Sequence, residues 1–170
     1  MNGKLEEACN KALEFYQLEV EIDKKREASF VEQLIELYEE NEDKEILVLY
    51  GAAHPIYYEL KRRGINVKRE FPYLPLIFPL PTELERKLRF GIPYTKDLVA
   101  QAIIVSAVET YLRDLGMSSI EAMRKSNRIV RKLSYDEIKD LSKYISENSL
   151  ARKMPIEAMV VWLKKRGYEI

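Results

Sequence analysis

The chain has 170 residues, and hydrophobic residues make up 46% of it, which is enough to build a folded core. Its 28 basic and 28 acidic residues cancel. This balance argues against a dedicated binder of nucleic acid or anionic membranes, because such proteins normally carry surplus positive charge. The single Cys9 cannot form an intramolecular disulfide and no apolar leader follows Met1, so we expect a protein of the reducing cytoplasm. The abundant Glu, Lys, Arg and Ile are also typical of thermophiles.

Two amphipathic helices are expected before residue 45. Apolar side chains recur at helical spacing over residues 4–21 and again over residues 24–41, which indicates one buried face on each helix. We expect a break between the two helices near Ile22 and Asp23. Because the apolar residues from Tyr16 to Ile22 also alternate, an edge strand is the alternative for the end of the first segment.

Residues 45–70 have the pattern of a β-α-β unit. Residues 46–50 are an apolar run that is too short for a helix and lacks polar alternation, which predicts a strand buried on both faces. A helix over about residues 55–63 and a second strand over residues 65–70 are expected to follow. Ligands commonly bind at the loop after the first strand of such a unit, and here that loop ends in His54, the only histidine of the chain.

Prolines are dense in the next segment, which is otherwise apolar. Five of them lie between residues 71 and 93: Pro72, Pro75, Pro79, Pro81 and Pro93. Proline at this density excludes a regular central strand and favours a stiff, extended path. We expect this path to pack along the surface of the domain; the alternative is that it offers an apolar segment to a partner.

The rest of the chain is predicted to be helical. Thr82 and Glu85 form a capping box, which predicts the start of a short helix. The most apolar segment, residues 98–115, predicts a helix buried on most sides, and its uninterrupted apolar part is too short to span a bilayer. Capping boxes or a first-turn proline predict three more helices, which begin near Ser118, Ser134 and Pro155.

Together these elements predict an α/β fold. Residues 1–90 would form an α/β unit in which a small, mostly parallel sheet with one β-α-β unit is flanked by helices, and residues 91–170 would form a C-terminal helical bundle. Two parallel strands alone make a marginal sheet. Either residues 18–22 or residues 76–78 extend it, or another copy of the chain does. We therefore expect a homo-oligomer or a protein that binds a protein partner.

His54 is the first candidate for chemistry. The small residues 51–53 that precede it leave room for a metal ion or a substrate to approach the imidazole. With no second histidine, further ligands for a divalent metal ion would be carboxylates, and Glu27 and Glu59 are the candidates. The alternative is a structural histidine that caps the following helix or bonds to a nearby backbone group.

The order of residues around His54 carries a family resemblance. Residues 47–54, LVLYGAAH, run from an apolar segment into G-x-x-H, and Arg26 with Glu27 opens the helix before them. This order resembles the second half of the TraB/PrgY and Tiki-like superfamily, which includes ChaN and erythromycin-esterase-like proteins. The resemblance covers about residues 23–71. It implies a metal-dependent hydrolase, or a degenerate relative of one, in which His54 is a metal ligand or a base and Arg26 orients an anion.

Two further hypotheses come from other parts of the chain. In the first, the protein is a non-catalytic protein-binding or homo-oligomeric assembly module that uses the proline-rich segment and the helical tail. In the second, nucleic acid binds a cationic stripe at helical spacing after Ser118, formed by Arg124, Arg128 and Arg131. The alternative for the stripe is a solvated helix face whose charges are paired with Glu121, Asp136 and Asp140.

Overall fold

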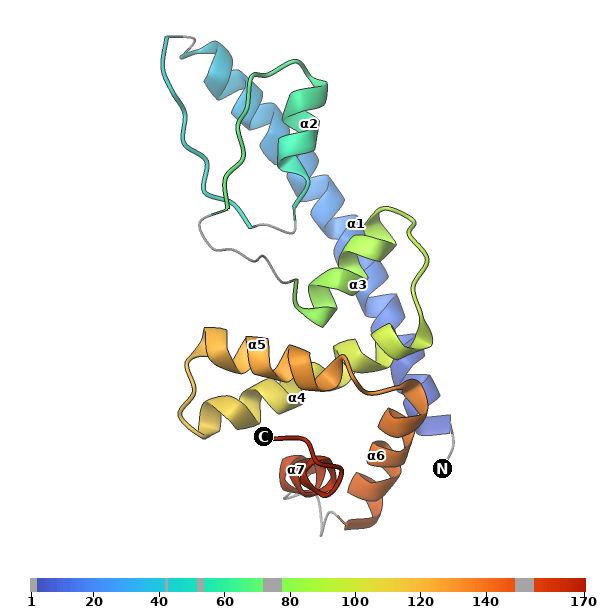
Figure 1. Ribbon diagram of the computed structural model, residues 1–170. Helices are drawn as coiled ribbons and strands as arrows, with labels where there is room; N and C mark the ends of the chain where they lie inside the picture. The colour runs from blue at the N-terminus through green and yellow to red at the C-terminus, as the bar shows by residue number, and fades with distance from the viewer. Residues whose placement is uncertain (1–2, 42, 52–53, 72–77, 149–154) are drawn as a thin grey trace.

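The computed structural model describes residues 3–41, 43–51, 54–71, 78–148 and 155–170, and within these ranges it contains helices and no strand. In chain order the helices are α1 (Gly3–Glu39), α2 (Ile56–Arg62), α3 (Leu80–Arg89), α4 (Lys96–Asp114), α5 (Ser119–Val130), α6 (Tyr135–Asn148) and α7 (Pro155–Lys165). Figure 1 shows α1 running along the molecule, with α2 beside its C-terminal half and the other helices gathered around its N-terminal half.

The predicted α/β fold with a parallel sheet is therefore wrong. The helix between the two expected strands is present as α2, but residues 46–50 form no ladder with any described residue. Leu47 and Leu49 are each 85% exposed, so this run is not a strand buried on both faces. An apolar run suits a strand, but a sheet also needs a neighbouring strand to accept its backbone hydrogen bonds. Within the described chain no such neighbour is in place.

α1 is one uninterrupted helix where two helices were predicted. The helical backbone continues through Ile22 and Asp23, and the alternative of an edge strand over this part is wrong as well. No Gly or Pro follows Gly3 within α1, so no residue forces the backbone out of helical geometry. Val20 and Val31 are both buried, which shows that tertiary contacts support α1 on either side of the expected break.

The helices pack around two separate hydrophobic clusters. The larger cluster joins the start of α1 and all of the helices from α3 to α7, and Leu80, Leu84, Val108, Leu112 and Leu163 are fully buried in it. The smaller cluster is built on Val31, Ile56 and Leu60, where α2 packs against the C-terminal half of α1. α1 thus belongs to both clusters, and the segment between them carries Asp23 and Glu27.

The helices predicted after residue 91 are confirmed. Thr95 caps α4, and Ser118 and Glu121 form the expected capping box of α5. Ser134 and Glu137 make the same reciprocal contacts before α6, and Pro155 opens α7. α4 is buried along most of its length, as its apolar composition predicted. No helix in the described ranges is long and apolar enough to cross a membrane.

α3 begins earlier than its capping box at Thr82 predicted. Its first residue is Leu80, and no side chain of its own N-terminal segment caps it. Instead, the backbone N–H of Leu80 donates to Oδ1 of Asn127 on α5 at 2.8 Å, in a buried position. A long-range contact therefore sets the start of α3. Much of the proline-rich path, residues 72–77, lies outside the described residues.

Candidate functional site

A tight turn positions His54 at the start of α2. The backbone N–H of His54 donates to the carbonyl oxygen of Gly51 at 3.1 Å, so the G-x-x-H spacing closes one turn. A Cβ atom at Gly51 would lie 3.1 Å from Cδ2 of His54, closer than side chains normally pack. The ring of Tyr50 meets the imidazole edge-on, with centroids 4.8 Å apart. A side chain at Gly51 would therefore require the imidazole to shift by a few tenths of an ångström.

The imidazole reaches across to α1. Nδ1 of His54 forms a hydrogen bond with Oε1 of Glu27, whose side chain is 7% exposed, while the side chain of His54 is 27% exposed. Asp23 lies one helical turn before Glu27 on α1, so both carboxylates are on the same face. One ligand atom from each of Asp23, Glu27 and His54 lies within 4.8 Å of the other two. We call these three residues the acidic–histidine cluster.

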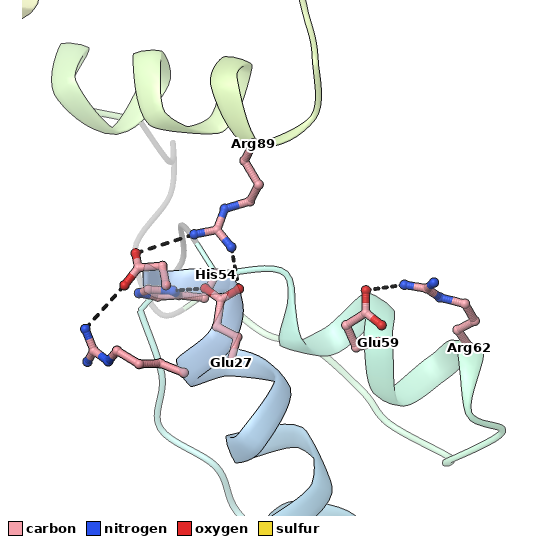
Figure 2. Close-up of polar contacts among 7 residues, drawn as sticks. Glu27, His54, Glu59, Arg62 and Arg89 are labelled. Atoms are coloured by element: carbon pink, nitrogen blue, oxygen red, sulfur yellow. Dashed lines mark hydrogen bonds and ion pairs between the residues drawn. The ribbon is translucent and has the colours of Figure 1, made fainter. Parts of the chain in front are cut away.

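Arg89, the last residue of α3, closes the cluster from the opposite side. Its Nη1 donates to Oε2 of Glu27, and its Nη2 donates to Oδ2 of Asp23 at 3.4 Å. Figure 2 shows the guanidinium reaching from the end of α3 toward Glu27, while His54 approaches the other side of that carboxylate. The side chain of Arg89 is only 7% exposed. Glu27 is thus held through both of its oxygens, one by each partner.

Negative charge exceeds positive charge where α1 faces α3. Glu85 lies one turn before Arg89 on α3. Burial raises the pKa of the Glu85 carboxyl, and the nearby charges of Asp23 and Glu19 raise it further, against the opposing effects of Arg89 and His54. Burial is the larger cause, and the smaller effect of Asp23 and Glu19 shows that acidic neighbours add negative charge around this carboxyl. Added negative charge favours the binding of a cation.

The chemistry of this donor set suits a divalent metal ion. One imidazole nitrogen with two carboxylates is a mixed nitrogen and oxygen set of the kind that holds Zn²⁺ or Mn²⁺. In a tetrahedral site with ligand distances of about 2.0–2.2 Å, two ligand atoms lie about 3.4 Å apart, and the ligand atoms here lie within 4.8 Å of one another. An ion shared by all three would have to take the place of the hydrogen bond between His54 and Glu27. Three protein ligands would also leave an open position for water or substrate.

The structure brings together some of the residues selected from sequence and separates others. His54 and Glu27 are in contact, and Arg26 lies at the rim of the cluster, where its Nη1 donates to Oδ1 of Asp23 at 3.3 Å. Glu59 instead pairs with Arg62 on α2 and does not belong to the acidic–histidine cluster (Figure 2).

Asp23 and Arg89 were not among the residues predicted from the sequence. The spacing of Asp23 four residues before Glu27 could have identified the first of them, because it places two carboxylates on one helix face. No signal in the sequence links Arg89 to Glu27, since the two residues are 62 positions apart.

The basic residues selected from α5 lie apart from this cluster and do not act as one stripe. Arg124 and Arg128 line a groove beside α5, whereas Arg131 bonds to Glu83 and to the carbonyl oxygen of Phe78.

The chain was compared with family models, curated proteins and solved structures, and none of them matches it.

Proposed function

We propose that the acidic–histidine cluster binds a divalent metal ion and that the chain is a metal-dependent hydrolase of the TraB/PrgY and Tiki-like type, or a relative that keeps only the metal site. The observation that carries this proposal is the convergence of Asp23, Glu27 and His54 on one point from α1 and the turn before α2. The resemblance over residues 23–71 supports it, because His54 and Glu27 both belong to the motifs of that resemblance and are in contact.

In this proposal each side chain has a defined task. Nδ1 of His54, Oε1 of Glu27 and a carboxylate oxygen of Asp23 are the ligands. The metal ion would polarise a substrate carbonyl or phosphoryl oxygen and lower the pKa of a bound water. Arg89 holds the second oxygen of Glu27, so it fixes how that carboxylate is presented to the ion. Arg26, exposed beside Asp23, is placed to orient an anionic group of a substrate.

The proposal is tested by measuring metal content and metal affinity. Purified chain should contain, or bind in a calorimetric titration, about one Zn²⁺ or Mn²⁺. The His54→Ala and Glu27→Gln variants should lose at least about tenfold in affinity, because each removes a ligand. Glu59→Gln is the matched control, since it makes the same change at a helical glutamate outside the cluster, and it should bind as the wild type does.

Because Glu27 also neutralises buried Arg89, its variant must be checked for folding by circular dichroism. His54→Ala leaves that ion pair in place and so tests the site independently. A wild-type chain that binds neither metal ion, or a His54→Ala variant that binds as tightly as the wild type, would show that the cluster is only a structural network.

The assembly module is the second candidate function, and the exposed apolar run at residues 46–50 favours it. Leu47 and Leu49 are 85% exposed. No backbone hydrogen bond within the described chain involves an amide or carbonyl of residues 46–50. An exposed segment with free backbone groups and apolar side chains can pair with an extended segment of another chain, and a second copy is the partner we propose.

Light scattering tests the assembly module. It should show a dimer that the Leu47→Asp/Leu49→Asp variant disrupts, and a monomeric wild type would exclude this function.

A further inference from the structure

A groove runs beside α5, far along the chain from the acidic–histidine cluster. Its volume is about 840 Å³, which is in the range of ligand-binding clefts. One wall is the face of α5 that carries Arg124, Lys125 and Arg128, together with Lys132 in the turn that follows. The other is built from residues 115–117, where α4 ends, and residues 167–169, where the chain leaves α7. Figure 1 shows the C-terminus lying beside α4 on this side of the molecule.

The four cations of this groove have no acidic partner within the described chain. None of Arg124, Lys125, Arg128 and Lys132 takes part in a side-chain hydrogen bond, an ion pair or a cation–π contact there. Two of the acids that could have balanced them, Glu121 and Asp140, have other partners. Glu121 bonds to Ser118 in the capping box, and Asp140 pairs with Arg166. Within the described chain the charges of this solvent-facing group are therefore unpaired, unlike the paired charges that the sequence also suggested.

The spacing of these cations suits more than one anionic group. Arg124, Lys125 and Arg128 fall at positions i, i+1 and i+4 of α5, and Lys132 follows in the turn after the helix ends. At 1.5 Å per residue, the three on the helix are spread over about 6 Å along its axis. Two acids also line the groove, Glu121 and Glu169, so four positive charges stand against two negative ones. This surplus is local, because the chain as a whole has no net charge.

Two glycine turns shape the opposite wall. Gly116 and Gly167 have φ of +88° and +82°, a conformation that other residues rarely adopt. Each turn ends a helix, with Met117 N–H donating to Leu112 and Tyr168 N–H donating to Leu163. The turn at Gly167 is followed directly by Tyr168, a half-buried residue that lines the groove. An aromatic residue, which also packs against the larger hydrophobic cluster, is thus among the residues that line the groove, although none lies within the basic run itself.

We propose that the groove beside α5 binds single-stranded nucleic acid, with its phosphates on Arg124, Lys125, Arg128 and Lys132 and a base against Tyr168. A positively charged channel with an aromatic surface is the usual arrangement for binding a single strand without sequence preference. A duplex fits less well, because a helix that reads the major groove must protrude into it. The basic face of α5 is instead flanked by residues 115–117 and 167–169.

The test is fluorescence anisotropy of the full chain with a labelled dT oligonucleotide of 12 nucleotides in 50 mM NaCl. We expect a Kd on the order of 1–100 µM that weakens as salt is raised, in line with non-specific binding through phosphates. The Lys125→Ala/Lys132→Ala variant should bind at least about fivefold more weakly and should lower the slope of log K against log salt by about 1 to 2.

The matched control is the Lys11→Ala/Lys143→Ala variant. It removes two lysines whose side chains are exposed on α1 and α6, where they pair with Glu7 and Glu147, so the change in net charge is the same. It should bind the oligonucleotide nearly as the wild type does. Tyr168→Leu should weaken binding several-fold while leaving the salt slope unchanged, and Tyr168→Phe should bind like the wild type, because a stacking ring is retained.

Competition separates single strands from other anions. Unlabelled dT oligonucleotide should displace the probe at micromolar concentration, whereas ATP and polyglutamate should need far higher concentrations. Displacement by ATP at concentrations lower than the oligonucleotide requires would identify a free nucleotide as the ligand and overturn the proposal. Equal displacement by polyglutamate, or an equal loss of affinity in the Lys11→Ala/Lys143→Ala variant, would overturn it as well.

Discussion

At the scale of single residues, the acidic side chains where α1 meets α3 reduce the stability of the folded state. Arg89 neutralises part of the negative charge of Asp23 and Glu27, but Glu85 lies in the same region and its carboxyl has a raised pKa, first because of burial and then because of its acidic neighbours. A group held in an environment that disfavours its charged form destabilises the folded state when it ionises. Such a site can persist where function requires negative potential.

The raised pKa of Glu85 predicts how stability depends on pH. Its folded-state pKa lies above the ordinary value of 4.5, so the folded protein holds the proton more tightly than the unfolded chain does. Folding stability therefore falls as pH rises from about 4.5 through the raised pKa, and the cost is fully present above it. Glu85→Gln should raise the melting temperature at pH 7, and this gain should disappear below pH 4.5.

Glu83→Gln is the control for that comparison. Glu83 is on the same helix but pairs with Arg131, so its replacement should leave stability unchanged or reduce it slightly. Melting curves of both variants across pH 4 to 8 would show whether the effect is specific to Glu85. A Glu85→Gln variant that is less stable than the wild type at pH 7 would contradict the prediction.

At the scale of elements, α3 depends on a contact with α5 for its start. The N–H of Leu80 is buried, and Asn127 is the side chain that accepts its hydrogen bond; the amide of Asn127 donates in turn to the carbonyl oxygen of Met123 at 2.8 Å. A side chain from one helix thus replaces the N-cap that α3 lacks in its own sequence. Because α3 ends in Arg89, this contact also helps to position the guanidinium at the acidic–histidine cluster.

Removing this contact should destabilise the protein. Asn127→Ala would leave the buried N–H of Leu80 without an acceptor, which costs about 1–3 kcal/mol. Asn127→Asp keeps an oxygen acceptor at the same place and should cost less. Urea unfolding of both variants measures the difference, and equal stability of Asn127→Ala and the wild type would show that the bond does not matter to α3.

At the scale of the whole molecule, α1 connects two clusters of unequal size. The larger cluster takes in six of the helices, whereas the smaller one has Val31, Ile56 and Leu60 as its buried residues. The acidic–histidine cluster lies between them on α1, and it takes His54 from the side of the smaller cluster and Arg89 from the side of the larger one. Local opening of the smaller cluster would therefore separate His54 from Glu27 while most of the fold remains intact.

A pair of Leu→Ala variants tests this division. Leu84→Ala removes a fully buried side chain from the larger cluster and should cost about 2–5 kcal/mol of global stability. Leu60→Ala makes the same change in the smaller cluster, so it should lower the urea midpoint much less while it increases amide hydrogen exchange in α2. Equal shifts of the urea midpoint in the two variants would show that the clusters unfold as one unit.

Local chemistry alone determined much of the helical structure. Capping boxes, a first-turn proline and the apolar length of residues 98–115 were enough to place α4 to α7, because helix hydrogen bonds and caps are made between residues close in sequence. The G-x-x-H spacing likewise directed attention to His54, whose turn is local, and the contact of His54 with Glu27 joined two residues that had been selected as candidates.

Only the tertiary structure decided the features that depend on residues far apart in the chain. Whether residues 46–50 join a sheet depends on a partner strand, so their apolar character could not settle it, and the structure leaves them exposed. Arg89 meets Glu27 across 62 positions, and Asn127 rather than Thr82 sets the start of α3. Such contacts form because packing brings whole helices together, and no local pattern in the sequence records which faces will meet.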